Sequence, residues 1–319
     1  MTGKRILLFT AKPEDQTRGF LEAAKSLDMD LVCVTNREGQ PGVPWNDHEI
    51  SVHFDVPEAA AYAVIEGVRR EGVDGILSLE NLPAVAAAYA ARGLGVAYNH
   101  PLAVEACLSR LRMREIFRDA GLLTPWFRKV LLSPVPEPAL LNITYPCVLL
   151  PMSPLPRQEA IRASDREEFL AAAERIHLLL ESAEIHAMHK PGQHDMIVEE
   201  YIPGEEIAVE GLLTKGELRI LNVFDKSFLG KAVQAMPSRH FLESQAAIER
   251  CMVSAVATIG LTHGPVRGEF LLNQNGVWPV QIALGPIEEL LAFGPRSVSD
   301  ANGEMVGFEE LLLRHAADC

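Results

Sequence analysis

The segment from Met196 to Gln281 most constrains the fold of this chain, because it places a strand, an acidic turn and a hairpin in a fixed order. The first strand begins as an apolar and β-branched run at Met196, becomes acidic at Glu199, and ends at Pro203-Gly204. This pattern predicts a strand that leaves a buried core and enters a loop.

A strand end of this kind leaves backbone N–H and C=O groups unpaired. We predict that the backbone of Glu200, Tyr201 and Ile202 reads the edge of a planar base. The Glu199 carboxylate would accept from an exocyclic amine, and that of Glu206 from ribose hydroxyls. On these residues alone, a solvated acidic strand end is the simpler interpretation.

Two further strands flank the turn Asn273-Gln-Asn-Gly276 and predict a β-hairpin over residues 266–282. If the loop has three residues, Gln274–Gly276, Glu269 lies opposite Gln281 and both side chains point to one face. Two oxygen ligands there would hold Mg²⁺ against a triphosphate. The alternative is an ordinary hairpin with two polar residues on its wet face.

In this order the strand, the pair Asp225-Lys226 and the hairpin resemble the ATP-grasp superfamily, in particular its carboxylate–amine ligase branch, which includes L-amino-acid ligases and carbamoyl-phosphate-synthase-like proteins. The resemblance implies an α/β chain in which an ATP-grasp fold follows a Rossmann-like parallel α/β domain. It also implies that ATP, with Mg²⁺, phosphorylates a small-molecule carboxylate or amino acid, and that an amine attacks the acyl phosphate.

The resemblance covers nearly the whole chain and divides it into three lobes. Residues 1–103 correspond to the preceding α/β domain, where apolar runs such as that over 5–10 predict buried parallel strands. Residues 104–195 correspond to a linker helix and a small lobe, and residues 196–319 to a large lobe that is short at its C-terminus. No Gly-x-Gly-x-x-Gly follows the first strand, so a dinucleotide fingerprint is lacking.

The sequence departs from the family at the residues that hold phosphate and metal. The first family lysine falls at Arg110, which keeps the charge with a different shape, and the second falls at Leu150, which offers a phosphate nothing. The glycine-rich loop becomes Met152–Arg157, whose two prolines lack N–H donors. The last motif becomes Gln281-Ile-Ala-Leu-Gly285, so a charged metal ligand becomes neutral. We therefore expect weak ATP and Mg²⁺ binding and impaired phosphoryl transfer.

Two cations remain for whatever chemistry persists. Lys226 lies where the resemblance implies proximity to phosphate, although a surface salt bridge to Asp225 or another acid would look the same in the sequence. Arg267 shares a strand face with Glu269 and would bind a carboxylate or phosphate bidentately; the alternative is an exposed strand charge.

The histidines give two candidate sites. His186, His189 and His194 suggest a metal site, but Pro191-Gly192 breaks the spacing, which favours a polar surface loop. His263 precedes the hairpin and is either a functional residue at its mouth or a histidine that stabilises the turn.

Composition excludes several partners. Lys and Arg total 29 against 43 Asp and Glu, and the net charge of -14 argues against nucleic acid and anionic membranes. No apolar run approaches the ~20 residues that span a bilayer. The five cysteines lack metal spacing and suggest reduced thiols, so we expect a cytoplasmic protein. A homodimer or a protein partner stays open.

Two hypotheses compete with an impaired ligase. One is a non-catalytic module, a pseudoenzyme that keeps the cleft for another small molecule or a partner protein, and the other is a cleft adapted to chemistry without ATP. Leu150 favours both of these, whereas Glu269 and Arg267 support residual ligase chemistry.

Overall fold

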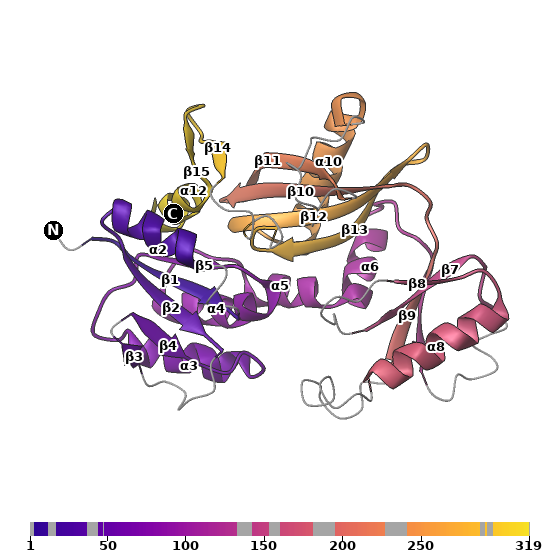
Figure 1. Cartoon of the computed structure of the whole chain (residues 1–319), viewed down its shortest axis with the longest axis horizontal. Helices are drawn as coiled ribbons and strands as arrows, with labels where there is room; N and C mark the ends of the chain where they lie inside the picture. Colours follow the sequence, from indigo (N-terminus) through magenta and orange to yellow (C-terminus); the bar gives the residue numbers. More distant parts are fainter. Residues whose placement is uncertain are drawn as a thin grey trace.

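Three main sheets follow one another along the chain in a computed structural model (Figure 1). The structure describes residues 3–11, 17–36, 44–46, 48–132, 142–152, 160–180, 195–226, 241–287, 291 and 296–318. Each sheet carries helices on at least one face, and the two antiparallel sheets are joined by a short hinge after Glu200.

The N-terminal sheet confirms the predicted parallel α/β domain. Its strands β4, β2, β1 and β5 run parallel, and β3 pairs antiparallel at the edge. The central strands are almost continuously apolar and buried, as strands covered on both faces require. In sheet order the strands are β3 (Pro44–Asn46), β4 (Glu49–Ser51), β2 (Asp30–Thr35), β1 (Arg5–Thr10) and β5 (Gly75–Ser78).

Helices from both ends of the chain cover this sheet. On one face, α2 (Arg18–Ser26) and the C-terminal α12 (Phe308–Asp318) bury a core that includes Phe20 and Leu312. On the other face, α3 (Pro57–Gly67) and α4 (Asn81–Leu94) bury a second core. The last helix of the predicted large lobe therefore packs on the first domain (Figure 1).

Helices α5 (Pro101–Leu108) and α6 (Arg110–Asp119) lead to the small antiparallel sheet. Helix α8 (Arg166–Leu180) covers one face of it and packs Phe169 against Val198. Because side chains alternate along a strand, Glu199 points to the opposite face. The sheet order is β6 (Phe127–Leu131), β9 (Asp195–Glu200), β7 (Cys147–Pro151) and β8 (Ile161–Ala163).

The large antiparallel sheet carries the candidate phosphate and metal residues. Helix α10 (Phe241–Ile259) covers one face, where Ile248 and Met252 pack in the core. The C-terminal part adds a short hairpin of β14 (Ser297–Ser299) and β15 (Met305–Gly307). The sheet order is β11 (Glu217–Asp225), β10 (Glu205–Thr214), β12 (Gly264–Asn273) and β13 (Gly276–Leu284).

The predicted hairpin is confirmed as β12 and β13, but the predicted three-residue loop is wrong. Asn273 pairs with Gly276, so only two residues form the turn. A bulge between Glu269 and Phe270 then shifts the register by one residue, and Glu269 pairs with Gln281. The bulge thus gives the predicted pairing by a different route.

A close backbone approach joins the large sheet to the first domain. Gly285 follows β13 with φ +86°, and a Cβ there would lie 2.1 Å from the Leu79 carbonyl oxygen. The backbone N–H of Leu284 donates to Asn81 Oδ1 at 2.6 Å. Glycine is therefore required at 285 by both conformation and space.

The described cysteines are free thiols, as the sequence predicts. Cys33, Cys107 and Cys147 are buried free thiols and Cys251 is half-buried, while Cys319 lies outside the described residues. Within the described ranges, no helix combines the length and the apolar character that a membrane crossing needs.

Candidate functional site

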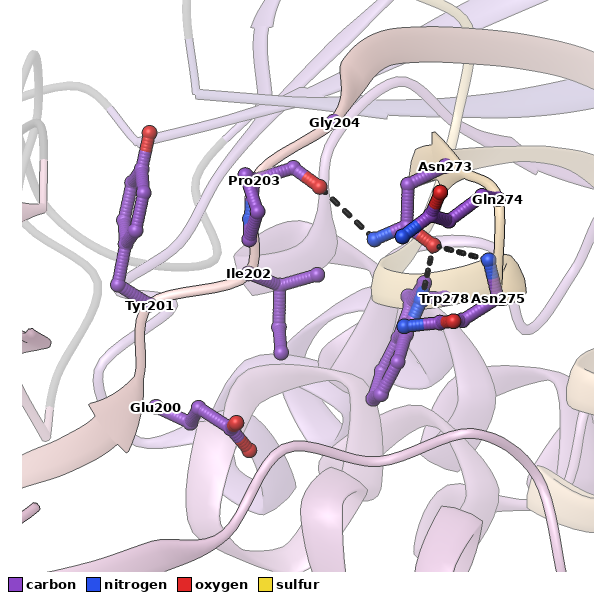
Figure 2. A pocket seen from close by; sticks show the side chains of 9 residues that line it. All are labelled: Glu200, Tyr201, Ile202, Pro203, Gly204, Asn273, Gln274, Asn275 and Trp278. Carbon is purple, nitrogen blue, oxygen red and sulfur yellow. Dashed lines mark hydrogen bonds between the residues drawn. The ribbon is translucent and has the colours of Figure 1, made fainter.

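A pocket of about 410 Å³ lies at the hinge between β9 and β10 (Figure 2). Three predicted base-reading residues, Glu200, Tyr201 and Ile202, are part of its lining. Glu200 and Tyr201 already donate their backbone N–H groups, to the carbonyls of Trp126 at 2.9 Å and Pro146 at 3.1 Å. Ile202 is therefore the residue best placed to read a base edge through its backbone.

Asn273 ties the hinge to the β12–β13 turn. Its Nδ2 donates to the Pro203 carbonyl at 2.8 Å, and its Oδ1 accepts from Trp278 Nε1 at 3.1 Å and from the Asn275 N–H at 2.9 Å (Figure 2). This amide fixes the indole of Trp278 as one wall of the pocket. Neither Asn273 nor Trp278 was among the predicted site residues.

The predicted amine acceptor Glu199 lies in a buried ion pair. Its Oε1 and Oε2 accept from Arg114 Nε and Nη2, each at 2.9 Å, and both side chains are at most 5% exposed. Arg114 Nη1 also donates to the carbonyls of Pro279 at 3.2 Å and Val280 at 2.8 Å. The pair therefore joins α6, β9 and β13, and contact of Glu199 with a base stays a prediction.

The sequence analysis missed Arg114. Its signal was the spacing from Arg110, because residues four apart lie on one helix face. A second arginine on the face that carries a candidate phosphate contact predicts a buried acidic partner nearby.

Lys226 lies between two of the predicted site acids. Its Nζ is 2.7 Å from Glu269 Oε2 and 3.5 Å from Glu206 Oε2. Burial lowers the pKa of Lys226, but the charge and hydrogen bond of Glu269, followed by those of Glu206, outweigh burial and raise the pKa overall. The Lys226 and Glu269 side chains remain 37% and 33% exposed, so a ligand can reach them.

Arg110 belongs to the same electrostatic environment. Burial lowers the pKa of its guanidinium, with Glu199 raising it, Arg114 lowering it and Glu269 raising it to smaller extents. No hydrogen bond or ion pair with another described residue holds the Arg110 side chain. An anion bound beside it would relieve the cost of burying this cation.

The predicted metal pair fits a weakly held magnesium ion only. Glu269 and Gln281 supply oxygen atoms from paired positions, which suits Mg²⁺ when phosphate oxygens and water complete its shell. Lys226 occupies Glu269 Oε2 and would have to move aside. No group of three His, Cys, Asp or Glu side chains suited to a metal occurs among the described residues.

The remaining predicted residues differ in how far they reach the cleft. Leu150 is 6% exposed and pairs with Ile197, so this position offers no charge. Arg267 Nη1 donates to the carbonyls of Leu284 at 3.0 Å and Pro286 at 2.9 Å, so part of its guanidinium is used by the backbone. The loop over 152–157 lies mostly outside the described residues.

His263 lies directly before β12, as the sequence predicts, and its side chain is buried. It is 4% exposed, and its ring centroid lies 4.7 Å from that of His315 on α12. Burial and then the charge of His315 lower the pKa of His263 to about 4. The second candidate set, His186, His189 and His194, lies outside the described residues.

A family model described as an ATP-grasp domain matches residues 143–289. The chain has an ATP-grasp fold. This match and the sheet order confirm the predicted fold class, an ATP-grasp fold preceded by a parallel α/β domain. No curated protein sequence matches the chain significantly.

Solved structures similar to this chain include three enzymes or enzyme domains. The L-amino acid ligase from Bacillus licheniformis has a TM-score of 0.75 at 20% identity, over 100% of this chain and 76% of the other. Carboxyaminoimidazole ribonucleotide synthase from Aspergillus clavatus with ATP has 0.70 at 14%, over 99% and 77%. The biotin carboxylase domain of Hydrogenobacter thermophilus 2-oxoglutarate carboxylase, with MgADP, has 0.70 at 18%, over 100% and 70%. Such identities establish a shared fold.

Proposed function

We propose that this protein descends from ATP-dependent carboxylate–amine ligases, binds a purine nucleotide between its two antiparallel sheets, and has impaired phosphoryl transfer. The observation that carries the proposal is the contact of Lys226 with Glu269 at 2.7 Å, beside Glu206. One lysine and two candidate ligand-binding acids form a half-exposed cluster, which a phosphate and a cation could divide between them.

In this proposal each retained residue has a separate task. Ile202 reads the base edge through its backbone, and Glu206 accepts from ribose hydroxyls. Arg110 and Lys226 contact phosphate oxygens, and Glu269 with Gln281 holds Mg²⁺, which when bound neutralises charge on the phosphates. Arg267, whose Nη1 donates to the carbonyls of Leu284 and Pro286, would contact a small carboxylate or amino acid as the resemblance implies.

The charge balance of the cleft explains why transfer would be slow. Three cations, Arg110, Arg114 and Lys226, are offset by three carboxylates, Glu199, Glu206 and Glu269, so Arg267 is the one positive charge of the proposed site that these carboxylates do not balance. Phosphoryl transfer depends on positioning and on charge neutralisation. Losing one well-placed electrostatic contact costs roughly 10²–10³ in rate, and Leu150 and Gln281 stand at two such positions.

Calorimetric titration with ATP, with and without Mg²⁺, and with adenosine tests the binding step. We expect weak ATP binding and an adenosine affinity close to that of ATP, because the base and ribose contacts are retained and phosphate contacts are reduced. Tight ATP binding with undetectable adenosine binding would contradict the proposal.

Release of ADP with amino acids and Mg²⁺ tests the chemical step. We expect little or no ADP, and little change in Glu269→Ala. Robust ADP formation that Glu269→Ala abolishes would establish a working ligase site instead.

If neither ATP nor adenosine binds, the cleft serves another small molecule or a partner protein, and the apolar Leu150 is the observation that favours this second candidate.

A further inference from the structure

The hinge pocket presents a carboxylate that is not used by the cleft. Glu200 follows Met196 and Val198, which pack toward α8, whereas Glu199 points to the opposite face and pairs with Arg114. In Figure 2 the side chains of Glu200 and Ile202 point toward Trp278, and the Tyr201 ring points away from them. Glu199 and Glu200 are neighbours on one strand, but Glu199 pairs with Arg114 whereas Glu200 lines the hinge pocket.

The charge of Glu200 is not balanced within the described part of the chain. Within the described residues, the only hydrogen bond of its carboxylate comes from the Trp126 backbone N–H, 3.5 Å from Oε2, and no cation there forms an ion pair with it. The side chain is half-buried at a concave surface. A half-buried carboxylate with one long hydrogen bond has unused capacity to accept from a charged donor.

The other walls of the pocket suit the same kind of donor. The Trp278 ring is held by its Nε1 contact to Asn273 Oδ1 at 3.1 Å, so a fixed aromatic ring lines the same pocket as the carboxylate. Cations bind favourably over an indole face. Ile202 offers an apolar surface, and Gln274 and Asn275 bring amide oxygens at the exposed rim.

We propose that this pocket binds a small organic cation, with a primary alkylammonium group between the Glu200 carboxylate and the Trp278 ring and its carbon chain against Ile202. A pocket of about 410 Å³ accommodates a ligand of the size of a diamine. The net charge of -14 attracts cations to the protein as a whole. The proposal does not require a bound nucleotide, because the side chains of Glu200 and Trp278 lie outside the cluster of Lys226, Glu206 and Glu269. It uses the same hinge pocket in which we assign the Ile202 backbone to the base, so the diamine and a base would compete there.

The test uses two probes of similar shape and different charge, 1,5-diaminopentane and 1,5-pentanediol, titrated calorimetrically into the full chain. We expect the diamine to bind, more weakly at high salt, and the diol to bind at least about tenfold more weakly. Equal binding of both probes, or no binding of the diamine, would overturn the proposal.

Substitutions then locate the site. Glu200→Gln should weaken the diamine about tenfold and Trp278→Leu about threefold, with Trp278→Phe closer to the original protein because a ring face remains. Glu205→Gln removes an exposed charge that does not line the pocket and should change nothing. Equal losses in Glu200→Gln and Glu205→Gln would mean general charge attraction and would refute a built site. Glu269→Gln should leave diamine binding intact, so failure of the nucleotide proposal and failure of this one give different results.

Discussion

The cleft contains two groups of ion pairs, Arg114 with Glu199 and Lys226 with Glu269 and Glu206, which differ in solvent exposure. This difference indicates which group stabilises the fold and which one can bind a ligand. Arg114 and Glu199 are 4% and 5% exposed and meet through two hydrogen bonds of 2.9 Å. Lys226 and Glu269 are 37% and 33% exposed, and the lysine divides its contacts between two acids. Both groups fall on residues or elements that the sequence pattern associates with nucleotide binding.

Desolvation explains what each group can do. A buried pair has already lost its water, so separating its partners leaves a bare charge in a low-dielectric site. A half-exposed pair exchanges its partners for water or a ligand at small cost. The first group therefore holds α6, β9 and β13 together, and the second is the one that can rearrange around a bound anion or cation.

The largest expected effect comes from breaking the buried pair. Arg114→Met leaves Glu199 buried without its partner and should lower the free energy of unfolding by about 3–5 kcal/mol. Urea unfolding followed by circular dichroism measures this change. Arg112→Met is the matched control, because Arg112 lies on the same helix in an exposed pair with Glu115.

The double variant Arg114→Met with Glu199→Met sharpens the same point. It removes both charges and should recover much of the loss, because no bare charge remains. If the single variant costs less than about 1 kcal/mol, the pair is not the structural joint described here.

A buried histidine should make stability depend on pH. The pKa of His263 is lowered from 6.5 to about 4, so the fold favours the neutral ring. Its contribution is complete above pH 6.5 and is lost as the pH falls toward 4, with a total of about 3 kcal/mol. Unfolding free energies of His263→Phe should decline less over this window than those of the original chain. His53→Gln, at an exposed histidine, should decline as the original does.

Much of this arrangement follows from sequence pattern, and the rest depends on contacts between distant residues. Apolar runs and turn residues predict the parallel sheet and the β12–β13 hairpin. The bulge at Glu269 lies in the pairing of β12 with β13, and α6 packs against β13. Arg114 on α6 is 85 residues from Glu199 and 165 residues from Pro279, so a local sequence pattern cannot predict these contacts. A local pattern also cannot tell that Lys226 pairs with Glu269 rather than with Asp225.

Removing the lysine of the half-exposed cluster should affect ligands more than stability. Lys226→Met should change the unfolding free energy by at most about 1 kcal/mol, because the pair is partly solvated. The affinity for ATP should fall about tenfold and that for adenosine should change much less, since in the proposed site Lys226 contacts phosphates directly and the ribose only through Glu206. Calorimetry measures both affinities in this variant and in the control Lys25→Met, which removes an exposed lysine elsewhere. Equal losses of ATP and adenosine would mean that the cluster shapes the whole cleft.

The smallest effect concerns a contact at the edge of the small sheet, where exposure is greatest. The Arg162 guanidinium lies 4.3 Å above the Tyr201 ring, and Arg162 is exposed on β8. An exposed cation–π contact is worth about 0.5–1 kcal/mol, so Arg162→Met should lower stability by no more than this. Tyr201→Leu should cost a similar amount, and a double-mutant cycle isolates the shared part from the separate losses. Arg175→Met, an exposed arginine on α8, controls for charge removal in the same lobe. A coupling energy above about 2 kcal/mol would mean that this exposed contact stabilises the fold nearly as much as the buried Arg114–Glu199 pair does. Exposure would then not distinguish the charges that stabilise the fold from those that do not.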